Sequence, residues 1–95
     1  MKWNRMKELA AQGLEIPLEV ALNTIKISLI GNREVKAVNH RGILIYETAR
    51  ILFQTVDGPV EVTGSGMTLV GLNEEYLHIM GRIHAIRLPE HRDET

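Results

Sequence analysis

Apolar and polar positions alternate in short runs from Thr24 to the C-terminal part of the chain. An alternation at every second residue is the period of a β-strand with one buried face. The runs are separated by clusters of Gly, Asn, Asp and Pro, which favour turns. The expected strands occupy residues 25–30, 35–39, 43–46, 51–53, 60–63, 67–71, 77–79 and 83–85.

This pattern predicts a mainly β protein, an antiparallel meander of about six to eight short strands. In a meander each strand pairs with the next strand along the chain, so every break between runs becomes a tight turn. The predicted turns include Gly31-Asn32-Arg33, His40-Arg41-Gly42, Asp57-Gly58-Pro59, Gly64-Ser65-Gly66 and Gly81-Arg82. A short β-solenoid is the alternative, because similar strands recur every 17 or 18 residues, at Ile25, Ile43, Val60 and Leu77.

The segment before the strands has a different composition. Good helix formers precede Gly13, which favours a short amphipathic helix over residues 1–13. We expect a β domain over residues 14–88 and a charged tail over residues 89–95. The helix would either cover the sheet or contact a membrane surface or a partner protein. In the second case the contact residues would be Lys2, Trp3, Arg5, Met6 and Lys7.

Several predicted strands carry apolar residues on both faces. A sheet with one wet face should not show this pattern, so the second face needs a cover. The cover could be the predicted helix, a fold-back of the sheet into a sandwich or barrel, or another subunit. The last option predicts a homo-oligomer whose candidate self-association residues are Leu44, Tyr46, Leu52 and Val70.

Composition narrows the possible functions. The chain has 95 residues and a formal net charge of -1, and this length is typical of one globular domain. It has no cysteine, which excludes thiolate metal sites and thiol nucleophiles. The basic N-terminus is not followed by the apolar run of a secretory signal, and no run is long enough for a membrane helix. We therefore expect a cytoplasmic protein that meets membranes only peripherally.

No convergent set of catalytic residues stands out. Ser65 lies between two glycines without the spacing of a nucleophile elbow. A hairpin at Gly81-Arg82 would point His78 and His84 to opposite faces, which is incompatible with a shared metal ion. Aromatic residues make up only 4% of the chain and do not form a base-stacking platform. The sequence thus predicts a protein that is not an enzyme and that binds no cofactor, metal, nucleic acid or small-molecule substrate. The alternative is a small β module that binds a ligand or a nucleic acid.

Ordered segments of the chain resemble the YabP/YqfC family of sporulation proteins. The resemblance covers about residues 15–88, and the short basic N-terminus looks most like the YqfC branch. The segments are Glu15-Ile16-Pro17-Leu18-Glu19-Val20, Ile25-Lys26-Ile27-Ser28-Leu29-Ile30-Gly31, Asn39-His40-Arg41-Gly42-Ile43-Leu44, Gly64-x-Gly66-Met67-x-Leu69 and Leu77-His78-Ile79-Met80-Gly81-Arg82-Ile83.

The resemblance implies a non-enzymatic protein of an endospore-forming bacterium that acts in spore envelope or coat assembly. It implies synthesis in the mother cell, a place at the forespore membrane and pairing with a membrane-associated sporulation protein. The family has no described catalytic residues, so the resemblance transfers none to this chain.

Overall fold

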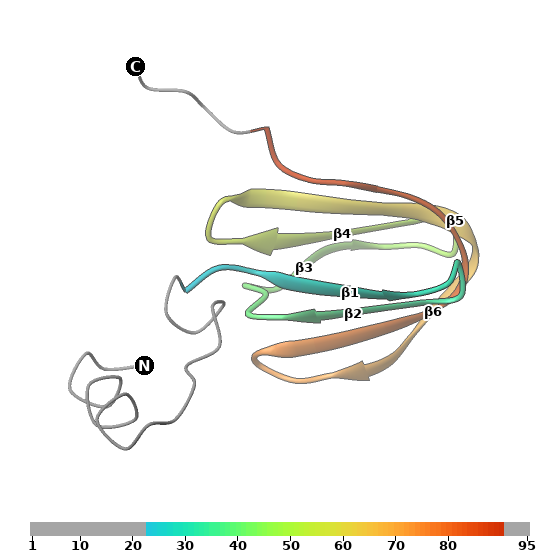
Figure 1. Cartoon of the computed structure of the whole chain (residues 1–95), viewed down its shortest axis with the longest axis horizontal. Coiled ribbons are helices and arrows are strands. Elements are labelled where there is room, and N and C mark those ends of the chain that lie inside the picture. Colours follow the sequence, from blue (N-terminus) through green and yellow to red (C-terminus); the bar gives the residue numbers. More distant parts are fainter. Residues whose placement is uncertain (1–22, 91–95) are drawn as a thin grey trace.

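Six antiparallel strands form one sheet in the computed structural model, which describes residues 23–90 of the chain (Figure 1). They are β1 (Lys26–Ile30), β2 (Glu34–Val38), β3 (Ile43–Tyr46), β4 (Arg50–Thr55), β5 (Gly58–Leu72) and β6 (Tyr76–Arg87). The prediction of a mainly β, antiparallel protein is confirmed. Each predicted run lies largely within one of these strands, because the alternation of apolar residues reports burial of one face.

The predicted helix-led meander is wrong. The order of strands in the sheet is β1-β2-β6-β5-β4-β3, so β2 pairs with β6 and not with its successor β3. Residues 23–90 contain no helix and no solenoid coil. The helix expected over residues 1–13 lies outside the residues that the structure describes.

Two of the predicted turns are instead bends inside long strands. β5 runs through Gly64-Ser65-Gly66, and β6 runs through Gly81-Arg82, so eight predicted runs become six strands. The pairing of β5 with β6 shifts register at Thr63/Gly64 and again between Ser65 and Thr68. Such bulges kink paired strands, and both strands curve sharply at the same end of the molecule (Figure 1).

Glycine is required at this bend because the two backbones approach closely. A Cβ atom at Gly81 would lie 2.7 Å from the carbonyl oxygen of Gly66 and 2.8 Å from the Cα of Met67. Gly81 also has a φ of 149°, a conformation that L side chains rarely adopt. A Cβ atom at Gly64 would collide with the carbonyl oxygen of Arg82. The glycine pattern that resembled hairpin turns therefore marks close contact between β5 and β6.

The bend divides the sheet into two half-sheets that face each other. The first half-sheet contains β1, β2, the start of β6 and the end of β5, whereas the second contains β3, β4, the start of β5 and the end of β6. Buried residues from both halves form one core: Val35, Ala37, Ile51, Phe53, Val60, Val62, Met67, Leu77, Ile79 and Ile83. The fold-back into a sandwich, one of the three covers considered for the apolar faces, is what the described sheet adopts.

At the bend, the loop of each outer hairpin forms further backbone hydrogen bonds to β6 or to β5. In the loop between β1 and β2, the carbonyls of Asn32 and Arg33 accept hydrogen bonds from the amides of Ile83 and Gly81. In the loop between β3 and β4, residues 48 and 49 accept in the same way from Met67 and Gly64. These bonds satisfy backbone groups that the bend would otherwise leave buried without a partner.

Candidate functional site

β3 lies alongside the second half of β5 and closes one side of the sandwich. The Tyr46 hydroxyl, at the end of β3, accepts a hydrogen bond of 3.0 Å from the amide of Leu69. At the other end, His40 Nε2 lies 2.7 Å from the carbonyl oxygen of Asn73. These two bonds connect β3 and the loop before it to the end of β5 and the loop after it, although β3 and β5 are not neighbours in the sheet order.

Four large apolar side chains remain exposed along this side. Their exposed fractions are 55% for Leu44, 51% for Tyr46, 52% for Val70 and 54% for Leu72. Leu44 and Tyr46 belong to β3, and Val70 and Leu72 belong to the adjacent part of β5. We call these four residues the apolar stripe. Three of the four predicted self-association residues thus lie together on one side.

The fourth predicted residue, Leu52, does not belong to the stripe. It is half-buried on the outer face of the second half-sheet, where it pairs with Ile45 of β3 and Glu61 of β5. The register of β3 shifts between Ile43 and Ile45, so Tyr46 pairs with the buried Ile51.

The loop before β3 is fixed by a buried histidine. His40 is 7% exposed, and its Nδ1 accepts a hydrogen bond of 2.9 Å from the amide of Gly42. Because Nδ1 accepts, the proton lies on Nε2, which donates to the Asn73 carbonyl. Both ring nitrogens are therefore satisfied by backbone groups, and the geometry indicates a structural role for this ring.

The other chemistry-bearing residues are spread over the surface. His78 donates from Nε2 to Glu34 Oε1 at 2.7 Å on the outer face of the first half-sheet, and His84 is exposed on β6. Ser65 is exposed at the bend, and Glu74 is exposed in the loop between β5 and β6. Within residues 23–90, no group of three or more His, Cys, Asp and Glu side chains is arranged to hold a metal ion.

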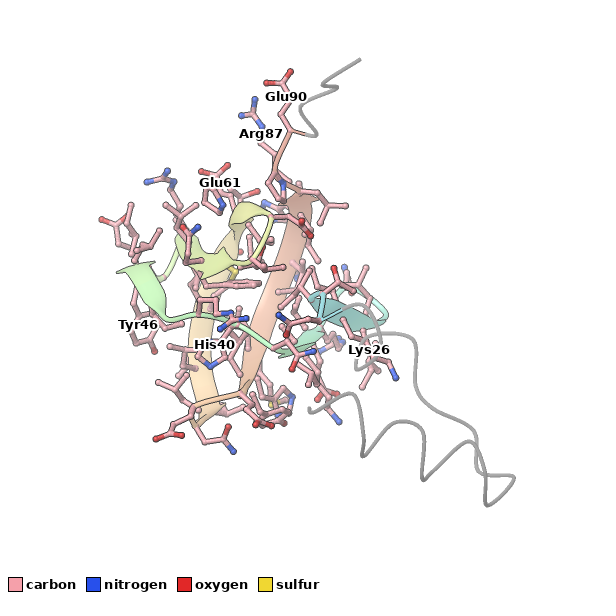
Figure 2. All side chains as sticks on the ribbon, turned by 90° about the vertical axis from the view of Figure 1, so that its left-hand side faces the viewer. Lys26, His40, Tyr46, Glu61, Arg87 and Glu90 are labelled. Atoms are coloured by element: carbon pink, nitrogen blue, oxygen red, sulfur yellow. The ribbon has the colours of Figure 1, made fainter. Side chains whose placement is uncertain are left out.

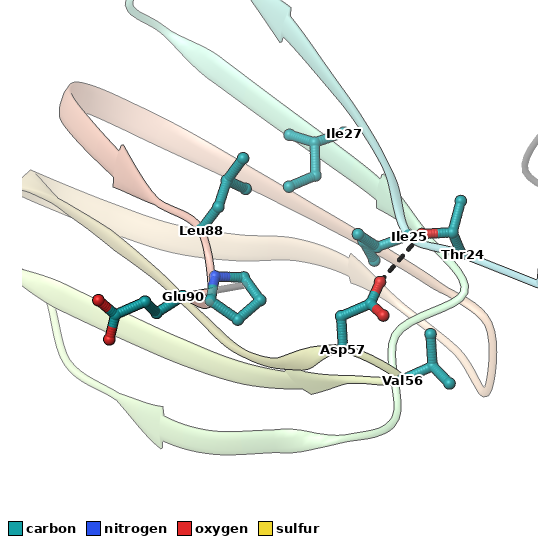
Figure 3. Close-up of a pocket in the computed structure, with 8 residues that line it drawn as sticks. Thr24, Ile25, Ile27, Val56, Asp57, Leu88 and Glu90 are labelled. Carbon is teal, nitrogen blue, oxygen red and sulfur yellow. Dashed lines mark hydrogen bonds between the residues drawn. The ribbon is translucent and has the colours of Figure 1, made fainter. Parts of the chain in front are cut away.

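A groove of about 730 Å³ lies on the side of the sandwich opposite the stripe. Its walls are the start of β1, the loop between β4 and β5, and the segment that follows β6 (Figure 3). Viewed from the end opposite the bend, Tyr46 and Lys26 mark these two sides of the molecule (Figure 2). The lining residues are Thr24, Ile25, Ile27, Val56, Asp57, Leu88, Pro89 and Glu90.

Sequence reasoning missed this groove because its walls come from three distant segments. The exposed Val56 and Leu88 flank turn and tail residues, where an isolated apolar residue carries no periodic signal. Only the fold of the sheet brings them beside Ile25 and Ile27. A hydrogen bond of 3.2 Å from the Thr24 hydroxyl to Asp57 Oδ2 crosses one end of the groove.

The predicted contact residues Lys2, Trp3, Arg5, Met6 and Lys7 lie outside the residues that the structure describes. Over residues 23–90, no helix is long and apolar enough to cross a membrane.

Residues 23–90 define a small β protein in which one bent sheet forms both layers of the sandwich and exposes an apolar stripe and a groove. The chain belongs to the YabP family, which it matches over residues 21–95. It is also 26% identical to the uncharacterized protein YqfC of Bacillus subtilis (strain 168) over 87 residues, covering 92% of this chain and 94% of YqfC. The resemblance noted from the sequence is thereby confirmed. Neither name states an enzymatic activity, and membership of this family is consistent with a sporulation-associated protein.

Proposed function

We propose that this protein is a non-enzymatic assembly protein of spore formation, which acts in building the spore envelope or coat as a scaffold or adaptor. The observation that supports a contact role is the apolar stripe of Leu44, Tyr46, Val70 and Leu72, four side chains about half exposed on one side of a small protein. Clusters of exposed apolar side chains on soluble proteins often mark sites of interaction with other proteins.

The stripe is suited to contact with a second copy of the chain. The stripe lies along β3, an edge strand of the sheet, and along the end of β5. This part of β5 has no strand neighbour on its outer side within the described sheet. Edge backbone groups and exposed apolar side chains therefore occur together, and pairing through both would bury them at once. A symmetric homo-oligomer is the usual result of such self-complementary surfaces.

Multi-angle light scattering at micromolar concentration tests this role. The wild-type chain is expected to have a mass above that of the monomer, and Leu44→Glu is expected to shift the mass to that of the monomer. Leu29→Glu is the matched control, since Leu29 is 57% exposed on β1, at the other end of the sheet. A wild-type monomer, or dissociation by the control alone, would refute self-association through the stripe.

The second part of the proposal is a place at the forespore membrane, on the cytoplasmic side of the mother cell, beside a membrane-associated sporulation partner. The support is the sequence of the N-terminus, where cations alternate with Trp3 and Met6. Each basic residue near an anionic surface contributes about 1 kcal/mol. The test is co-sedimentation of the full chain with phosphatidylglycerol vesicles.

The variant carrying Lys2→Glu, Arg5→Glu and Lys7→Glu should lose co-sedimentation, whereas reversal of three cations within the β domain should not. The control cations are Arg33, Lys36 and Arg82. Equal sedimentation of the two variants would show that the N-terminal cations do not make the contact.

A further inference from the structure

The groove opposite the apolar stripe is lined by apolar and by acidic residues. We call the apolar residues the floor and the acidic residues, Asp57 and Glu90, the rim. Its apolar lining comes from Ile25, just before β1, from Ile27 of β1, from Val56 and from the segment that begins with Leu88. Val56 and Leu88 are 51% and 61% exposed, so the groove presents apolar surface that the described residues do not cover. Burial of such surface by an occupant would be favourable.

The charges at the groove have one sign. Asp57 and Glu90 are the only ionisable residues among the described residues that line it, and Figure 3 labels both. None of the eight described residues that line the groove is Lys or Arg. An apolar occupant with cationic groups would therefore complement both the floor and the rim, whereas an acidic occupant would be repelled.

The backbone of the walls favours an extended occupant. β1 pairs with β2 alone, and the end of β6 around Arg87 pairs with β5 alone among the described residues. Sheet edges recognise extended peptides by adding them as a strand, and pockets beside the edge then select alternate side chains. A volume of about 730 Å³ is within the ordinary range of ligand sites.

We propose that this groove binds an extended peptide segment of a partner protein, in which apolar side chains alternate with Lys or Arg. The apolar side chains contact Ile25, Ile27 and Leu88, and the cations pair with Asp57 and Glu90. This site is separate from the apolar stripe, so peptide binding and self-association can fail independently.

Selection from a random-peptide phage library on the full-length protein tests the proposal. The expected consensus combines apolar residues with Lys or Arg, and a fluorescent peptide of that consensus then serves as the probe for titration. Leu88→Glu should weaken binding of the probe at least about tenfold, because it puts a charge on the apolar floor. Met80→Glu is the control, since Met80 is an exposed apolar residue beside the bend that belongs neither to the groove nor to the stripe, and it should leave the affinity unchanged.

The rim is tested by neutral variants of the same shape. Asp57→Asn and Glu90→Gln should each weaken binding about twofold to fivefold, as expected for exposed ion pairs. Each should also reduce the dependence of affinity on salt. Asn at position 57 can still accept the hydrogen bond from Thr24, so the end of the groove stays closed.

Three outcomes would overturn the proposal. The first is a consensus without cations, and the second is loss of binding in Met80→Glu but not in Leu88→Glu. In the third, the wild type selects no peptide but the Lys2→Glu, Arg5→Glu, Lys7→Glu variant does. That result would mean that the basic N-terminus of the chain itself competes for the groove.

Discussion

Substitution of Gly81 by Ala tests the close approach of β5 and β6 at the bend. The added Cβ would lie 2.7 Å from the carbonyl oxygen of Gly66 and 2.8 Å from the Cα of Met67, both of them backbone atoms that cannot rotate away. The φ of 149° adds conformational strain of about 1–3 kcal/mol. Overpacking against the backbone adds a similar amount. We therefore expect a loss of about 4 kcal/mol in the free energy of unfolding.

Gly66→Ala is the matched control for this substitution. Gly66 lies at the same bend with a φ of 58°, but a Cβ atom there would meet no atom within 4 Å. Its expected cost is the left-handed strain alone, about 1–2 kcal/mol. Urea unfolding at one fixed protein concentration measures both variants, since self-association would add concentration-dependent stability.

In thermal unfolding, Gly81→Ala should lower Tm by on the order of 15–30 °C for a domain of this size. Equal losses for Gly81→Ala and Gly66→Ala would refute the close contact, because strain would then explain both. A stable Gly81→Ala protein would show that the two strands can separate at the bend.

Two further substitutions test the loop before β3 and the core. His40→Phe should lower the free energy of unfolding by about 1–3 kcal/mol, because it leaves a backbone amide and a carbonyl without partners. The control His84→Ala, at an exposed site, should change it by less than about 0.5 kcal/mol. Similar values for the two variants would contradict the structural role of the His40 ring. Phe53→Ala should cost about 3–5 kcal/mol by opening a cavity at a fully buried site, and Leu29→Ala, at an exposed site, should cost far less, again by urea unfolding.

The strands could be predicted from the sequence because their signal is local. Ile51 and Phe53 alternate with half-buried neighbours, and the loops at residues 31–33 and 73–75 contain residues that favour turns. The order of the strands could not be predicted, since the pairing of β2 with β6 joins residues about forty positions apart. Nothing in either strand alone specifies its partner.

The bend shows why glycine is ambiguous in a sequence. Gly64 and Gly81 have the same neighbours that a hairpin turn would have, yet each serves a close approach between two extended backbones. The candidate surfaces were only partly predictable for a related reason. Leu44 and Val70 were identified by their place in the alternation, but the groove required three segments that only the folded sheet brings together.

The dependence of both half-sheets on β6 has a consequence for the order of folding. β1 with β2, and β3 with β4, are hairpins of neighbouring segments, and such local pairs close quickly. β6 is the last strand of the sheet to leave the ribosome, and it alone joins the first hairpin to the rest of the sheet. Until residues 76–87 emerge, the inner apolar faces of the two hairpins have no shared core. The nascent chain is therefore expected to remain as separate hairpins with exposed edges until β6 emerges. Its fold is then completed in one late, long-range step, in which β6 pairs with β2.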